Sequence, residues 1–155
     1  MAMQAVPAID PMVVVLGARA AEIRPRMQFG AFKIVVAEDW VEGQAASLRA
    51  GVAALDGADA ILVCLGDQPF ITSQVIARTL DADDPRADAI RTAYKGVPGH
   101  PVLLKQSLLA RVPELKGDVG ARDLLAGARV KTWEAGHLCD PTDIDTREQL
   151  EAIAT

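Results

Sequence analysis

The chain has 155 residues, half of them hydrophobic and 24% charged, a balance that is typical of a globular protein and excludes a disordered one. Its formal net charge is −5 and it contains no basic run, so the sequence argues against nucleic acids and membrane surfaces as partners. A chain of this length suits a single domain over residues 1–155.

Strand-like and helix-like segments alternate in the first half of the chain. Apolar, β-branched runs predict strands at residues 12–16, 32–36 and 60–65. Helical composition follows each run, at residues 18–24, at residues 44–55 and from Thr72 onward. Strands that alternate with helices in this way predict βαβ units and a parallel sheet.

A different pattern begins after residue 85. Residues 89–94 and 101–104 have the composition of strands and enclose a turn at residues 95–99, which predicts a hairpin-like pair instead of another crossover. Short helices are expected at residues 107–112 and 121–126, a last strand at residues 129–133 and a terminal helix at residues 146–154.

The two cysteines, Cys64 and Cys139, lie far apart and lack the spacing of metal ligands. Cys64 falls inside an apolar strand, where a thiol behaves as a small hydrophobe. The N-terminus has neither the basic residues nor the long apolar run of a signal peptide, and no stretch approaches the length of a membrane span. These features predict a cytoplasmic protein.

The stretch at residues 60–70 organises the rest of the chain. An apolar run without charge ends at Gly66-Asp67-Gln68-Pro69, the pattern of a strand that is buried on both faces and ends in a turn. Asp67 is therefore expected at the carboxyl end of a parallel strand, where open α/β sheets bind their ligands. A carboxylate there suits magnesium, although it could equally fix the turn or cap the next helix.

A second acidic cluster occupies residues 140–146. Asp143 and Asp145 precede Thr146, which has the features of a helix start, and Asp145 could act as the cap. If the segment folds back beside Asp67, two carboxylates could instead flank one magnesium ion that bridges phosphate oxygens.

Three further segments carry candidate ligand-binding residues, each with a purely structural explanation beside it. The turn at residues 42–47 opens a helix whose N–H groups favour an anionic group, but capping explains it equally well. His100, between Gly99 and Pro101, is held out of the helical region, and a lone histidine is more often structural. Residues 117–122 combine Asp118 and Arg122, which could also be an N-cap and a surface arginine.

Five motifs follow one another along the chain: EGQAASLRAG at residues 42–51, LGDQP at 65–69, GHPVLL at 99–104, GDVGAR at 117–122 and DIDT at 143–146. Together they resemble those of the molybdenum-cofactor nucleotidyltransferases, the MobA-like NTP transferases, and in particular the cytidylyltransferase branch. The resemblance extends over the chain from Met12 onward.

This resemblance implies a three-layer α/β/α fold with a mostly parallel, Rossmann-like sheet of the nucleotide-diphospho-sugar transferase type. Such enzymes join a nucleoside monophosphate from CTP or GTP to a phosphorylated pterin cofactor and release pyrophosphate with magnesium. For this chain the resemblance favours CTP over GTP. Alignment and charge neutralisation supply most of the chemistry of an in-line attack at phosphorus.

The resemblance also assigns expected roles to residues. Asp67 is expected as the central magnesium (Mg2+) ligand and Asp145 as the second, and both are the expected catalytic residues. The other expected ligand-binding residues are Glu42, Gly43 and Ser47 beside the nucleotide, Gly66 and Gln68 around Asp67, and Gly99, His100, Pro101, Asp118 and Arg122 on the acceptor side.

One departure from the family concerns its opening strand and glycine-rich loop, of the form LAAGxSxRMG, which wraps the triphosphate. This chain has no such segment, and Leu16 to Met27 match the family's second strand and following helix instead. The expected fold therefore lacks its first strand, and activity is expected to be impaired. Since that strand belongs in the middle of the sheet, two unpaired edges are expected, with a homo-oligomer or a poorly behaved monomer as the consequence.

Three functions follow from these observations. The first is a magnesium-dependent nucleotidyltransferase. The second is a non-catalytic binding or assembly module derived from that family. The third is an unrelated acidic-site phosphatase, against which the first strand offers no following aspartate as nucleophile.

Overall fold

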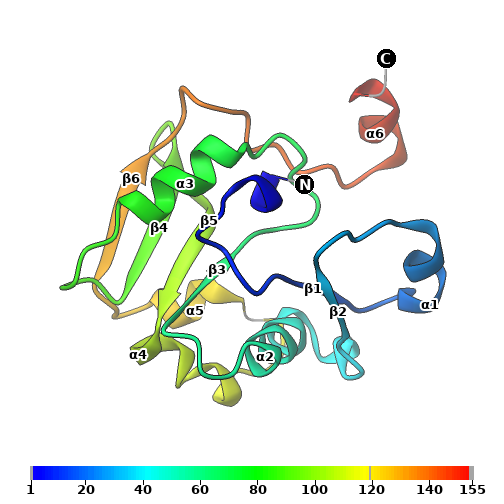
Figure 1. Cartoon of the computed structure of the whole chain (residues 1–155), viewed down its shortest axis with the longest axis horizontal. Coiled ribbons are helices and arrows are strands. Elements are labelled where there is room, and N and C mark those ends of the chain that lie inside the picture. Colours follow the sequence, from blue (N-terminus) through cyan, green and yellow to red (C-terminus); the bar gives the residue numbers. More distant parts are fainter. Residues whose placement is uncertain (1, 119, 154–155) are drawn as a thin grey trace.

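Two sheets form the framework of the molecule, and the computed structural model describes residues 2–118 and 120–153 (Figure 1). The strands are β1 (Val13–Leu16), β2 (Lys33–Val36), β3 (Ala60–Val63), β4 (Ala89–Tyr94), β5 (Val97–Lys105) and β6 (Val130–Glu134). The helices are α1 (Ala20–Ile23), α2 (Gln44–Ala54), α3 (Ser73–Asp81), α4 (Gln106–Leu109), α5 (Ala121–Leu125) and α6 (Arg147–Ile153). Short 3-10 helices occur at Ala2–Ala5, Arg24–Arg26, Trp40–Glu42 and Val112–Glu114. The predicted terminal helix is α6, and its predicted last residue, Ala154, lies outside the described residues.

The larger sheet has the strand order β3-β5-β4-β6, and β1 pairs in parallel with β2 in a sheet of its own. β4 is parallel to β6, whereas β5 is antiparallel to β3 and to β4. The predicted hairpin is confirmed, because β4 turns into β5 through Lys95 and Gly96. Both turn residues have positive φ, 52° and 79°, which suits a tight connection between twisted strands.

Helices cover both faces of the larger sheet (Figure 1). α2, α4 and α5 pack leucines onto one face, against Ile61, Val102 and Leu104. α3 covers the other face, where Leu80 packs near Ile90 and Leu103. Neighbouring residues of one strand thus point into different cores, and each fully buried leucine stabilises the fold by about 1.5–3 kcal/mol. The α/β fold class with three layers is confirmed, and the described strands form two parallel and two antiparallel pairs, so the larger sheet is mixed.

The expectation for β3 was wrong in its pairing. β3 is not a parallel strand between two neighbours. Among the described residues it lies at the end of the larger sheet and pairs with β5 alone, in antiparallel orientation. Its apolar sequence has another cause: Ile61 packs toward α2 and Leu62 toward α3, while Leu65, beyond the strand, is 38% exposed. Apolar side chains in a strand indicate that its faces are buried, but they do not indicate which strand is its hydrogen-bonded neighbour in the sheet.

The two sheets are not joined edge to edge. In the part of the chain that the structure describes, β1 bonds only to β2 and β3 only to β5, so each has an unpaired edge. α2 connects the two sheets, because Leu48 and Val52 pack on the core of the larger sheet while Gly51 lies against Val15 of β1. The N-terminal segment runs between the sheets, with the Val6 side chain buried (Figure 1).

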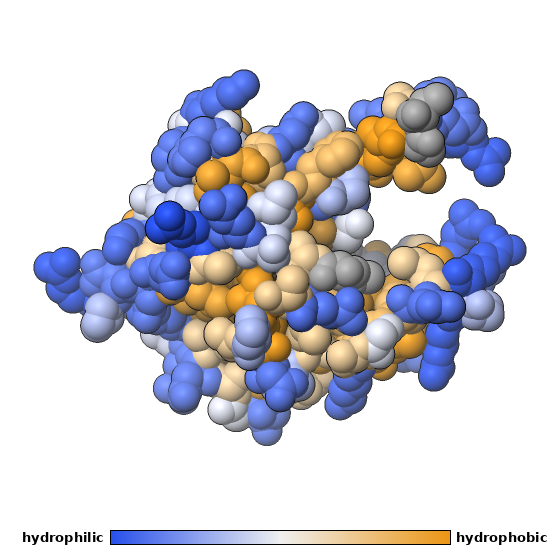
Figure 2. Space-filling model, turned by 45° about the horizontal axis from the view of Figure 1, so that its top comes forward, coloured by the Kyte–Doolittle hydropathy of each residue, from blue (hydrophilic) through white to orange (hydrophobic). Residues whose placement is uncertain are grey.

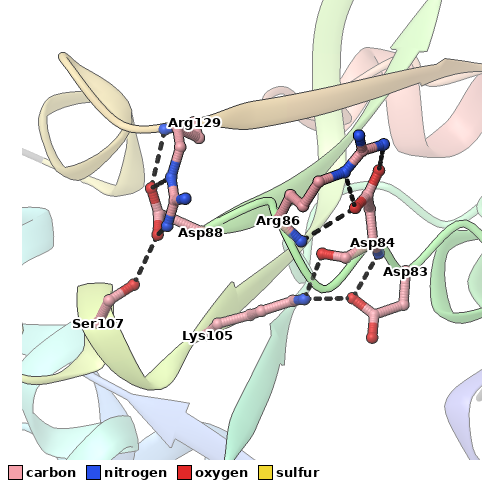
Figure 3. A network of polar contacts seen from close by, with 7 residues as sticks. All are labelled: Asp83, Asp84, Arg86, Asp88, Lys105, Ser107 and Arg129. Carbon is pink, nitrogen blue, oxygen red and sulfur yellow. Dashed lines mark hydrogen bonds and ion pairs between the residues drawn. The ribbon is translucent and has the colours of Figure 1, made fainter.

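A polar network fixes the end of the larger sheet at which β4 and β6 begin (Figure 3). Asp88 accepts hydrogen bonds from the Arg129 guanidinium at 2.7 and 3.0 Å and from the Ser107 hydroxyl at 3.1 Å. Lys105 pairs with Asp83 at 2.6 Å. These contacts tie the end of β5 and the start of β6 to the start of β4. No helix within residues 2–118 and 120–153 has the length and apolar character needed to cross a membrane.

Candidate functional site

The register of β3 on β5 brings the Asp67 loop to the part of β5 that contains His100. Val63, the last residue of β3, is paired with Val102. The chain therefore leaves β3 toward Pro101 and His100 and reaches Asp67 four residues later. This end of the larger sheet lies opposite the network around Asp88, because β4 ends here at Tyr94.

The second acidic segment folds back onto the Asp67 loop. The Ile144 N–H donates to the carbonyl oxygen of Asp67 at 2.8 Å. The Gln68 side-chain amide donates to Asp143 Oδ1 at 2.8 Å and to the carbonyl oxygen of Pro141 at 3.2 Å. Segments about 75 residues apart in sequence are thus joined by three hydrogen bonds.

The carboxylates of Asp67 and Asp145 are exposed, and within the described chain neither forms a hydrogen bond or ion pair. The interpretation of Asp145 as a helix cap is wrong. Thr146 Oγ1 accepts from the Gln149 N–H at 3.2 Å, and Gln149 Oε1 accepts in return from the N–H groups of Asp145 and Thr146, which is a capping box. The helix start therefore leaves the Asp145 carboxylate available for another partner.

His100 is half-buried beside the acidic residues. Burial lowers the pKa of its imidazole, and the nearby carboxylates of Asp143 and Asp67 oppose that shift. The Tyr94 hydroxyl donates to the His100 carbonyl oxygen at 2.7 Å, which fixes the backbone there. A Cβ at Gly99 would lie 3.0 Å from the Tyr94 ring, so this position has little room for a side chain. Pro101 is fully buried behind them.

The chemistry of these side chains fits a hard divalent cation. Two oxygen-donating carboxylates, those of Asp67 and Asp145, and the buried Gln68 Oε1 have no partner among residues 2–118 and 120–153. No group of three or more acidic, histidine or cysteine side chains in the described residues could hold a metal ion by itself. A magnesium ion held here would therefore complete its coordination with water and substrate oxygens, as this ion commonly does.

A second cluster forms where α2 begins. Gly43, at φ 102°, lies against the loop at residues 117–118. A Cβ on Gly43 would be 2.7 Å from Asp118 Cα. Asp118 Oδ1 accepts from the Gln44 N–H at 3.4 Å, and the Gly117 carbonyl accepts from the Ala45 N–H at 3.3 Å. Asp118 thus caps α2; its interpretation as the cap of the helix at residue 121 is wrong, because Gly120 precedes that helix.

Four other predicted residues have less defined surroundings. Gly66 faces open space where its Cβ would be, so a ligand can approach the backbone. Ser47 is half-buried in α2 and Arg122 is exposed on α5, and no hydrogen bond or ion pair of either side chain is found in the described residues. Glu42 is engaged, because its Oε2 lies 2.7 Å from Arg49 Nη2.

Arg49 was not among the predicted site residues, although it lies within the EGQAASLRAG motif. Arg49 also forms an ion pair with Asp39 and donates to the Leu115 carbonyl at 2.7 Å. No helical spacing rule identifies this pair, because Glu42 ends the 3-10 helix Trp40–Glu42 and Arg49 lies in α2, on the other side of Gly43.

The structure therefore groups the predicted residues into two clusters, one around Asp67 and one at the start of α2. In the described residues no hydrogen bond or ion pair connects the clusters. The molecule is hollowed on the side between the arm that carries α6 and the part formed by β1, β2 and α1 (Figure 2).

Comparison with known proteins gives consistent matches. The MobA-like NTP transferase domain family matches residues 1–134. The nicotine blue oxidoreductase of Paenarthrobacter nicotinovorans is 33% identical over 150 residues, which cover 92% of this chain and 71% of that protein. The purine catabolism protein PucB of Bacillus subtilis is 32% identical over 126 residues, which cover 76% of this chain but only 59% of that protein.

Solved structures match the fold over nearly the whole chain. The crystal structure of Rv0371c from Mycobacterium tuberculosis is 29% identical, with a TM-score of 0.80 over 94% of this chain and 76% of that one. A second structure of Rv0371c, a complex with manganese, is 26% identical over 94% of this chain and 77% of that one, with a TM-score of 0.77.

Proposed function

The chain belongs to the MobA-like NTP transferase domain family, and from this membership we propose that it transfers a nucleoside monophosphate from CTP, in preference to GTP, to a phosphorylated pterin acceptor and releases pyrophosphate. We propose that residues 1–155 act as one nucleotidyltransferase-like domain. The observation that carries the proposal is the contact between the Asp67 loop and residues 141–145, with two unpartnered carboxylates beside it.

In this proposal Asp67 and Asp145 hold one divalent cation, which we propose is magnesium. The manganese complex of Rv0371c supports a divalent ion in this family. When bound, such an ion neutralises charge on the phosphates as a phosphoryl bond breaks. Gln68 supports the site, because its amide donates hydrogen bonds to Asp143 and Pro141 and so holds this segment beside the Asp67 loop.

The remaining residues bind and orient the two substrates. The turn at Glu42 and Gly43, with Ser47 one turn further along α2, is proposed to receive the nucleotide, because the first N–H groups of a helix attract anionic groups. Gly99, His100 and Pro101 are proposed to line the acceptor side, with Arg122 beside it. The contact of Asp118 with Gln44 supports placing Asp118 beside the nucleotide instead of the acceptor.

Calorimetric titration of CTP and of GTP, each with magnesium or manganese, tests this function. Asp67→Asn and Asp145→Asn are expected to weaken binding of the metal-bound triphosphate at least about tenfold, about 1.4 kcal/mol, without a change in thermal unfolding. Asparagine keeps the backbone contacts of both residues. Asp59→Asn, an exposed aspartate just before β3, is the matched control and should bind as the unmodified chain does.

Equal loss in the Asp59 variant, or unchanged affinity in the Asp67 variant, would contradict the proposed site. A non-catalytic binding module remains the second candidate, and the division between β1 and β3 favours it. Release of pyrophosphate on addition of a phosphorylated pterin separates the two, because a module binds without turnover.

A further inference from the structure

Arg49 connects three segments of the chain from a single position in α2. One guanidinium nitrogen, Nη2, pairs with Glu42 at 2.7 Å and also with Asp39. The other, Nη1, donates to the Leu115 carbonyl at 2.7 Å. The side chain is only 22% exposed, so these contacts are partly shielded from water.

The segments that Arg49 joins are those that frame the start of α2. Asp39 and Glu42 belong to the turn that leads from β2 into Gly43. Leu115 follows the 3-10 helix Val112–Glu114 and lies two residues before Gly117. Arg49 therefore holds both sides of the contact between Gly43 and the loop at residues 117–118.

The contact between Gly43 and the loop at residues 117–118 is tightly packed. A Cβ at Gly43 would lie 2.7 Å from the Asp118 backbone, and one at Gly120 would lie 2.6 Å from Gln44 Oε1. The hydrogen bonds across it are long, 3.4 Å from the Gln44 N–H to Asp118 and 3.3 Å from the Ala45 N–H to Gly117. Long hydrogen bonds are weak, so they do not fix the two loops by themselves.

Arg49 also neutralises negative charge beside the turn. Asp39 and Glu42 place two carboxylates next to a turn proposed to receive a triphosphate, and Arg49 is the cation paired with both. The planar guanidinium reaches several acceptors at once in a fixed fork, whereas a lysine ammonium is a flexible point charge.

We propose that Arg49 is a positioning residue for the nucleotide-binding turn. It sets the spacing between residues 42–44 and residues 117–118 and neutralises the carboxylates beside them. It acts on the binding of the triphosphate more than on the chemical step, because none of its contacts reaches the Asp67 cluster. This inference rests on the proposed function.

The test compares Arg49→Lys with Arg129→Lys. Arg129 also pairs with a carboxylate, Asp88, but at the opposite end of the larger sheet. Arg49→Lys is expected to raise the KM for the triphosphate about tenfold and to change kcat less than about threefold, whereas Arg129→Lys should change neither. A kcat loss as large as the KM change, or equal effects of both substitutions, would overturn the proposal.

Hydrogen exchange tests the same role without any nucleotide. The amides of Gln44 and Ala45 should exchange faster in Arg49→Lys than in the unmodified chain, while Arg129→Lys leaves them as they are. Unchanged protection of both amides would overturn the positioning role. If the unmodified chain binds no triphosphate while exchange behaves as expected, the proposed function fails and the mechanical role of Arg49 stands.

Discussion

Gln68 is the side chain that joins the two acidic segments. Its amide nitrogen donates both to Asp143 Oδ1 and to the Pro141 carbonyl, while its Oε1 is buried and has no partner in the described part of the chain. An unsatisfied buried oxygen destabilises the fold, so the two bonds made by the nitrogen must offset that cost. Gln68 thus positions Asp143 and, through the chain, Asp145.

Gln68→Ala is expected to loosen residues 141–145 from the Asp67 loop. Loss of two hydrogen bonds should lower the free energy of unfolding by about 1–2 kcal/mol. The affinity for metal-bound triphosphate should fall about tenfold, because Asp145 is no longer held beside Asp67. Denaturant unfolding and calorimetry measure the two effects, with Gln74→Ala, an exposed position on α3, as control. Unchanged affinity would show that the segment stays in place without Gln68.

For single residues, the sequence indicated which side chains lie close together but not which hydrogen-bond partners each of them has. The order of the motifs placed Asp67 and the DIDT segment in one site, and the contact from Ile144 to Asp67 bears out their proximity. The partners of Asp118 and Glu42 could not be read from the sequence. The sequence around a capping carboxylate does not tell whether it caps the next helix or a distant one. Asp118 accepts from the Gln44 N–H at the start of α2, 74 residues earlier.

Individual elements follow local rules closely. α3 begins at Ser73, beside the predicted start at Thr72, and Thr72 Oγ1 accepts from the Val75 N–H at 3.3 Å as an N-cap does. The end of the β4–β5 hairpin falls at Lys95 and Gly96, within the predicted turn. Turn and cap preferences are properties of a few adjacent residues, so the sequence determines them. The partner of β3 is β5, whose paired residues lie 39 to 45 positions further along the chain, and no local pattern specifies it.

The network at the start of β4 predicts a pH dependence for this part of the sheet. Hydrogen bonds, chiefly from the Arg129 guanidinium and backbone N–H, hold the pKa of Asp88 well below its ordinary value. Such a carboxylate stabilises the fold above its unfolded pKa of about 3.9, and this stabilisation is lost as the pH falls toward the folded value.

Asp88→Asn should therefore lower the Tm at neutral pH and reduce the further loss of Tm on acidification from about pH 5 to about pH 2. Scanning calorimetry over that range measures the effect. Asp59→Asn, which lies outside the network, should keep the full acid dependence. An Asp88 variant with the same acid dependence as the unmodified chain would rule out this origin.

The whole molecule is organised around the division between β1 and β3. Each of these strands presents an unpaired edge, and open edges pair readily with other chains. α2 is the main connection between the sheets, so their spacing depends on the packing of one helix. Two such edges were expected because the family resemblance implies a central strand that has no counterpart in this sequence, and the pairing of the described strands leaves β1 and β3 each with a free edge.

We expect the protein to associate as its concentration rises, giving species larger than the 16.4 kDa chain. Ala60→Lys should shift the distribution toward the monomer, because a charged side chain on an edge strand opposes pairing with a second strand. Ala53→Lys, an exposed position on α2, should leave it unchanged. Light scattering coupled to size-exclusion chromatography measures both. A monomer at every concentration would contradict the expectation.

The chain has two tryptophans, and the division places one on each side. Trp133 of β6 is half-buried, and its indole N–H donates to Thr79 Oγ1 at 3.2 Å. Trp40 follows β2 and is 44% exposed. Each sheet thus has its own intrinsic fluorophore, one emitting from a sheltered environment and the other from near water. Trp40→Phe and Trp133→Phe proteins each keep one tryptophan. The shift in its emission wavelength during thermal unfolding would reveal whether the two sheets unfold together or one after the other.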